Sequence, residues 1–224
     1  MISALRLKLI CCDVFARLAY AVAAKSPHIV DIELLPMLAH NEPDKLRRDL
    51  QQAIDKSGPL GYNRIILAYG LCGNATANLS SQIPMIIPRM HDCSAMFLGS
   101  QEKFLQVFGS RLSAPWSSRG YLERCLQDDY KKLTDEYGEE NAKYIWETMN
   151  PPAEVYIKLE GFEYKTVSQD DDNPDWEVVE GDTGWFKRLI NGPWDNKDFL
   201  EILPGTEIEP IYDMKEIFRS KKYL

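Results

Sequence analysis

The stretch "YNRIILAYGLCGN", residues 62–74, joins an apolar strand to a glycine-rich turn and decides how the rest of the chain is interpreted. Ile65, Ile66 and Leu67 leave neither face of the strand polar, which is typical of a strand buried on both sides of a parallel sheet. Gly70 and Gly73 flank the cysteine of the turn. Because open parallel sheets bind ligands at the ends of their strands, this turn predicts a site at the sheet edge.

Strands and helices alternate on both sides of this stretch. The predicted strands cover residues 5–12, 30–36, 62–70 and 83–89, and the predicted helices cover 14–25, 41–58 and 100–109. The second helix is expected to begin with Asn41 as N-cap and to end at Gly58. The alternation predicts an α/β fold with a doubly wound, mostly parallel sheet. Pro84 and Pro88 favour a short strand or an edge position for the fourth strand.

The second half of the chain is less regular and predicts a mixed α+β region. Helices are expected over 121–149, with a break near Gly138, and over 183–192; strands are expected over 154–160 and within 199–213. Residues 168–182 are acidic and rich in turn formers, which predicts an exposed loop. We expect one domain over residues 1–224, with a βα-rich half at 1–112 and a helical and strand half at 113–224.

Composition narrows the functional class. The net charge of -8 argues against binding to nucleic acid or to an anionic membrane, because both require a basic face. The sequence has neither an apolar run long enough to span a bilayer nor an uninterrupted apolar segment of the signal-peptide type. We therefore expect a cytoplasmic protein whose 5 cysteines are free thiols, metal ligands or redox groups.

Cysteine and histidine residues follow three of the predicted strands. Cys11 and Cys12 end the first strand, Cys72 follows the third, and His91 and Cys93 follow the fourth. Because parallel strands end at one edge, these residues predict a Cys/His metal site there, with zinc as the favoured ion.

The turn beside Cys72 adds a second kind of ligand contact. Gly70, Gly73 and Asn74 are predicted to contribute to binding a cofactor or small-molecule ligand through the backbone N–H groups of the turn. His40 could reach the same edge or have a local capping or loop role, and Cys125 is expected in the core or at the surface.

The same convergence of strand ends allows two other kinds of chemistry. Cys72 is a possible nucleophile with His91 as its base, and Cys72 with Cys93 is a possible redox pair. A third interpretation is that the thiols only pack, since free cysteine is among the residue types most often buried. Convergence alone does not separate these alternatives.

Three short motifs resemble an uncharacterised family of domain-of-unknown-function proteins from anaerobic bacteria and methanogenic archaea. They are "YGLCGN", the "PRMHDC" that follows it, and "RGYLE", in which Tyr121 stands where that family has tryptophan; the resemblance covers roughly residues 6–125. It implies an association with corrinoid-dependent methyltransferases and a role in one-carbon transfer, in which a bound metal would activate a thiol or water. An accessory protein that binds a corrinoid, a metal or a partner methyltransferase without catalysis is the alternative.

Overall fold

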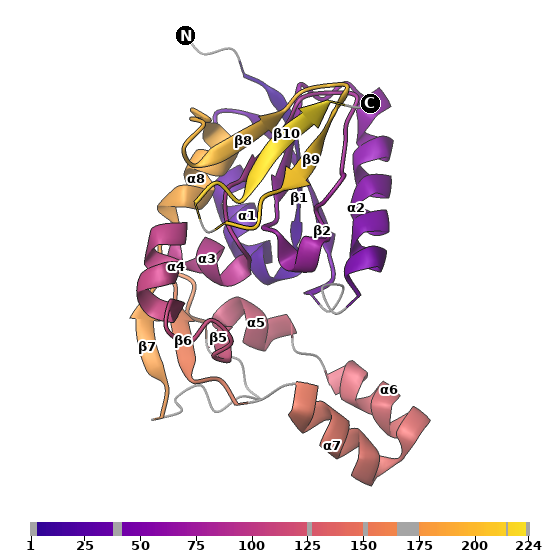
Figure 1. Ribbon diagram of the computed structural model, residues 1–224, viewed down its shortest axis with the longest axis vertical. Helices are drawn as coiled ribbons and strands as arrows, with labels where there is room; N and C mark the ends of the chain where they lie inside the picture. Colours follow the sequence, from indigo (N-terminus) through magenta and orange to yellow (C-terminus); the bar gives the residue numbers. More distant parts are fainter. Residues whose placement is uncertain are drawn as a thin grey trace.

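A computed structural model gives the architecture of residues 4–37, 42–124, 127–149, 152–164, 175–213 and 215–222 (Figure 1). Its main feature is a five-stranded sheet in the order β2-β1-β3-β4-β8. The strands are β1 (Arg6–Cys12), β2 (Ile29–Leu35), β3 (Arg64–Ala68), β4 (Met85–Pro88) and β8 (Phe199–Ile202). The first four are parallel, and β8 runs antiparallel to β4. The predicted α/β class with a mostly parallel sheet is confirmed.

Different elements cover the two faces of this sheet. Along β1, Leu7 and Leu9 pack into a core with α1 (Ala16–Ala23) and α8 (Gly184–Asn191). The next residue, Ile10, faces the opposite core, which contains α2 (Pro43–Ser57) and the antiparallel pair β9 (Thr206–Pro210) and β10 (Phe218–Lys222). The alternation of side chains along the strand thus produces the two buried faces of a doubly wound sheet.

The prolines predicted that β4 is short or lies at the sheet edge, and the first alternative is confirmed. The strand is short, as predicted, but it lies inside the sheet between β3 and β8. Pro84 precedes the strand and contributes its carbonyl, which accepts a hydrogen bond from the Ile65 amide at 3.0 Å. Pro88 is the last residue of the strand. Because the prolines lie at the two ends of β4, their missing N–H groups remove few of the hydrogen bonds between β4 and its neighbours. An interior position in the sheet is therefore tolerated.

A second, smaller sheet lies beyond the carboxyl ends of the main strands (Figure 1). It consists of the parallel strands β5 (Trp116–Ser118), β6 (Val155–Lys158) and β7 (Glu177–Glu180). The helices around it are α3 (Cys93–Leu98), α4 (Gln101–Phe108) and α5 (Arg119–Arg124). The expectation of a loop over 168–182 is wrong at β7, where "EVVE" pairs with β6 despite its charge; residues 165–174 lie outside the described residues.

Helices α6 (Gln127–Tyr137) and α7 (Glu139–Met149) form a hairpin that extends away from both sheets (Figure 1). The predicted break falls at Gly138, whose φ of 77° suits glycine. The N-cap position of α2 is Glu42, and its side chain makes no capping hydrogen bond. Asn41, predicted for that position, lies outside the described residues, as do His40 and Cys125.

No helix within the described ranges has both the length and the apolar character needed to cross a membrane.

Candidate functional site: a thiol-lined cavity

The carboxyl ends of β1, β3 and β4 meet at one edge of the main sheet. Cys12 ends β1, Cys72 follows β3, and Cys93 begins α3, the next element after β4. All three line one cavity of about 240 Å³. The complete lining is Cys12, Pro36, Met37, Leu46, Tyr69, Cys72, Gly73, Asp92, Cys93, Met96, Trp116 and Tyr121. The convergence of cysteines expected from the topology is therefore present between β1 and β3, where the strand order reverses.

Only one of the two adjacent cysteines of β1 lines the cavity. Cys11 is fully buried among the apolar side chains on the α1 face of the sheet. Cys12 lines the cavity because successive strand side chains point in opposite directions. The structure therefore separates two residues that the sequence could not distinguish.

The turn after β3 has an unusual backbone. Cys72, Gly73 and Asn74 have φ values of 45°, 63° and 69°, all in the left-handed region. Gly73 lines the cavity, whereas Asn74 does not. Cysteine seldom adopts positive φ, and such strain is concentrated at functional sites, with a cost of about 1–3 kcal/mol per residue.

Gly70 lies so close to the backbone of residues 90–92 that a side chain there has no room. A Cβ atom built there would lie 2.7 Å from the Met90 carbonyl oxygen and 2.8 Å from the Asp92 nitrogen. Beside it, the Leu71 amide donates to the His91 carbonyl at 2.8 Å. Gly70 does not line the cavity, so of the three residues predicted to bind a cofactor only Gly73 lies at the site.

His91 does not line the cavity either. Its ring stacks on Phe104, with 5.8 Å between ring centroids, and its Nδ1 lies 3.2 Å from the Asp92 Oδ2. The hydrogen bond to Asp92 raises the pKa of His91 above its ordinary value, against the opposing effect of burial. The backbone changes from extended at Asp92 to helical at Cys93, so the His-x-Cys spacing does not direct both side chains to one point.

Asp92 contributes to the cavity wall while holding the start of α3. Its Oδ1 accepts hydrogen bonds from the Ser94 amide at 2.9 Å, the Ser94 hydroxyl at 2.5 Å and the Ala95 amide at 3.2 Å. Burial alone would raise the pKa of Asp92, but the hydrogen bonds from His91, Ser94 and Ala95 lower it below its ordinary value. Both carboxylate oxygens are thus engaged within the protein.

Their surroundings disfavour ionisation of the three cavity thiols. Burial raises the pKa of Cys12, Cys72 and Cys93 above the ordinary thiol value, and negative charge on neighbouring thiols and acidic side chains raises each of them further. Among the described residues that line the cavity, none is Lys, Arg or His. The lining therefore supplies no positive charge to stabilise a thiolate.

Two tyrosines and a tryptophan complete the site. The Tyr121 hydroxyl lies 3.3 Å from the Cys93 sulfur, and Trp116 packs edge-on against the Tyr121 ring with 4.7 Å between ring centroids. The Tyr69 hydroxyl is buried and has no hydrogen-bond partner in the described part of the chain. The sequence assigned none of these a site role, although Tyr69 directly precedes the glycine turn and strand alternation is a signal that could have identified it.

Within the described residues, no group of three or more His, Cys, Asp or Glu side chains is arranged to hold a metal ion. The cysteines share a cavity without converging on one point. The predicted metal site thus remains a prediction, and Cys12, Cys72 and Cys93 are the predicted ligands that line the cavity.

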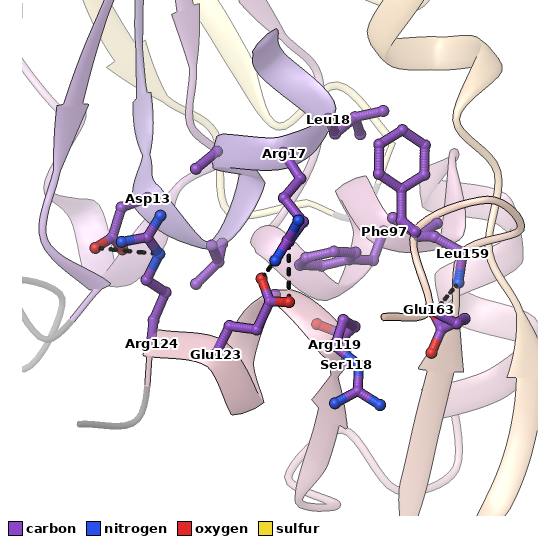
Figure 2. Close-up of a pocket in the computed structure, with 14 residues that line it drawn as sticks. Asp13, Arg17, Leu18, Phe97, Ser118, Arg119, Glu123, Arg124, Leu159 and Glu163 are labelled. Carbon is purple, nitrogen blue, oxygen red and sulfur yellow. Dashed lines mark hydrogen bonds and ion pairs between the residues drawn. The ribbon is translucent and has the colours of Figure 1, made fainter. Parts of the chain in front are cut away.

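A second, smaller cavity of about 20 Å³ lies between α1 and α5 (Figure 2). Arg17 Nε donates to both carboxylate oxygens of Glu123, at 2.9 and 2.7 Å, and Arg124 Nε lies 4.0 Å from the Asp13 Oδ2. The volume is sufficient for about one water molecule. These charged side chains join α5 to α1 and to the turn directly before α1, so we assign them a structural role.

Comparison with known proteins gives one match. A family model described as "Protein of unknown function (DUF1638)" matches residues 34–166, which include Cys72, Asp92, Cys93, Trp116 and Tyr121. No curated protein and no solved structure matches the chain significantly. The expected resemblance to an uncharacterised family is confirmed, and the chain belongs to the DUF1638 family of proteins of unknown function.

Proposed function

We propose that this protein binds a thiophilic metal ion, such as zinc or copper(I), with Cys12, Cys72 and Cys93 as its ligands. The observation that supports the proposal is that the ends of three parallel strands bring three half-buried thiols to one cavity. Thiolates are the preferred ligands of soft metal ions. His91, which the sequence included in the ligand set, is left out because its side chain stacks outside the cavity.

The charge of the cavity supports the same ligand class. A buried thiolate is costly without a positive partner, and the described lining contains no cationic side chain. A metal cation would provide that charge while displacing the thiol protons. The side chains would have to turn toward a common point, since they do not converge on one as they stand.

The nucleophile and redox interpretations have less support. An activated thiol needs a lowered pKa, whereas burial raises the pKa of both Cys72 and Cys93. His91, the base that the sequence suggested, is paired with Asp92 at 3.2 Å. The positive charge that a metal brings is what these thiols lack.

The size of the cavity limits what a bound metal could act on. Pockets for drug-sized ligands have volumes of about 300–1,000 Å³, so a cavity of about 240 Å³ suits a smaller molecule. A whole corrinoid would have to bind elsewhere on the protein or on a partner. Activation of a small thiol or water for methyl transfer would fit beside the metal, and that role follows from the family resemblance alone.

Metal analysis of protein purified without oxygen or chelators tests the proposal. We expect the wild type to hold about one equivalent of a soft metal after reconstitution, and Cys12→Ala, Cys72→Ala and Cys93→Ala to lose most of it. Cys11→Ala is the matched control, because Cys11 is adjacent in the same strand but faces the opposite core. Equal metal content in all variants, or less than about 0.1 equivalent in the wild type, would contradict the proposal.

A further inference from the structure

Tyr69 brings a buried hydroxyl group to the cavity. The residue directly follows β3, lines the cavity and is only 3% exposed. Its hydroxyl oxygen has no hydrogen-bond partner within the described ranges. An unpaired buried hydroxyl destabilises a folded protein, and such groups are rare. A ligand that accepts a hydrogen bond from Tyr69 would remove this cost.

The Tyr69 hydroxyl is available as a donor. Burial raises the pKa of Tyr69 well above its ordinary value, and charge on Cys12, Cys11 and Cys72 raises it further. The hydroxyl therefore keeps its proton at neutral pH. Cys12 and Cys72 both line the cavity, so their influence on the pKa of Tyr69 indicates that the hydroxyl lies near their thiols.

The other oxygen-bearing side chains of the lining already have partners. The Asp92 carboxylate accepts hydrogen bonds from the amides of Ser94 and Ala95, and the Tyr121 hydroxyl lies 3.3 Å from the Cys93 sulfur. An anionic ligand would meet the Asp92 charge and no cationic side chain in the described lining. The polar part of the site therefore suits one uncharged acceptor.

Most of the remaining wall is apolar. Its side chains are Pro36, Met37, Leu46, Met96 and Trp116. An apolar cavity of about 150 Å³ accommodates benzene, so a cavity of about 240 Å³ has room for a benzene ring with a small substituent. Thioether sulfurs also make favourable contacts with aromatic rings. The wall therefore suits a compact apolar body, and an aromatic ring in particular.

We infer that the cavity binds a small uncharged molecule that has an apolar body, such as one aromatic ring, and one oxygen acceptor for the Tyr69 hydroxyl. This inference goes beyond the proposed metal site and does not depend on it, because it uses the tyrosine and the apolar wall and not the thiols.

The test uses metal-free protein, prepared with a chelator and a phosphine reductant, and three probes of similar size. Acetophenone carries a carbonyl acceptor, ethylbenzene has a similar apolar body without it, and benzoate carries a negative charge. Ligand-observed NMR titration gives the dissociation constants. We expect acetophenone to bind about threefold to tenfold more tightly than ethylbenzene, because it adds one neutral hydrogen bond, and benzoate to bind more weakly than both.

Two phenylalanine variants assign the hydrogen bond. Tyr69→Phe removes the hydroxyl and keeps the ring, so it should bind acetophenone no more tightly than ethylbenzene. Without ligand, its melting temperature by circular dichroism should equal or exceed that of the wild type, because an unpaired hydroxyl is lost. Tyr62→Phe is the matched control before β3. The Tyr62 hydroxyl donates to the Asp31 Oδ2 at 2.8 Å outside the cavity, so this variant should melt lower and bind acetophenone like the wild type.

Equal affinity of the wild type for acetophenone and ethylbenzene would overturn the inference. So would the absence of binding of either compound at millimolar concentration, tighter binding of benzoate, or unchanged acetophenone affinity in Tyr69→Phe. A fall in the melting temperature of ligand-free Tyr69→Phe as large as that of Tyr62→Phe would mean that the hydroxyl is already paired, and would also overturn it. Because no metal takes part in these measurements, their failure would leave the proposed metal site to be judged by metal analysis.

Discussion

At the scale of single residues, Gly70 sets how closely the end of β3 approaches the turn after β4. Gly70→Ala would place a Cβ atom 2.7 Å from the Met90 carbonyl oxygen, against backbone that cannot move without displacing the site. We expect this variant to lose about 1–3 kcal/mol of unfolding free energy, measured by urea denaturation.

Gly58 provides the control for this substitution. It ends α2 with an ordinary helical backbone, and a Cβ atom there would meet no atom nearer than the Gln82 side chain at 3.6 Å. Gly58→Ala is expected to be neutral or to stabilise the protein by up to about 1 kcal/mol. If both variants unfold at the same urea concentration, the close approach at Gly70 has no energetic importance.

The candidate site could be predicted from the sequence in part. Parallel strand ends brought Cys12, Cys72 and Cys93 to one cavity, because that convergence depends only on strand order. The sequence could not show whether the His91 side chain points into the cavity. That depends on where the backbone changes from extended to helical, which happens between Asp92 and Cys93. Trp116 and Tyr121 lie on β5 and α5. Their position at the site depends on tertiary packing, which no local sequence pattern indicates.

At the scale of elements, α3 carries Cys93 and Met96 and depends on its cap. The Asp92 side chain accepts hydrogen bonds from the Ser94 and Ala95 amides at the start of this short helix. We expect Asp92→Ala to lose about 0.5–2 kcal/mol of unfolding free energy, and Asp92→Asn to keep most of it, because asparagine also caps helices. Urea denaturation measures both.

The comparison of the two Asp92 variants separates two roles of the side chain. If Asp92→Asn is destabilised as much as Asp92→Ala, the charge that pairs with His91 matters more than the cap.

The elements that sequence reasoning missed have common physical causes. Helix α3 has only 6 residues, too few for helical periodicity to be recognised. Strand β7 reads "EVVE", with polar ends typical of a loop, and it forms because β6 offers an edge for pairing. Short elements are determined by their neighbours more than by their own residues.

At the scale of the whole molecule, the second half of the chain completes the sheet of the first. Strand β8 pairs with β4, and Phe15 of the first half meets Trp185 of α8 at 6.2 Å between ring centroids. We therefore expect a fragment of residues 1–112 to show no cooperative thermal unfolding, because β4 loses a partner strand and one face of the sheet loses α8. Thermal unfolding of the fragment and of the full chain is measured by circular dichroism. A cooperative transition in the fragment would mean that its half folds independently.

The order of the main sheet was predictable at this scale because alternating strands and helices admit few connections. The sequence could not predict the antiparallel addition of β8 or the separate sheet of β5, β6 and β7. Each depends on pairing between segments that are distant in sequence.

The left-handed backbone at Cys72 also has an evolutionary consequence. Glycine adopts this conformation without strain, whereas cysteine at a φ of 45° does not, so the position favours glycine on conformational grounds. A single nucleotide change converts a cysteine codon into a glycine codon. A lineage in which the site has lost its use is therefore expected to replace this cysteine with glycine early, and retention of the thiol elsewhere in the family would indicate continued selection for its sulfur.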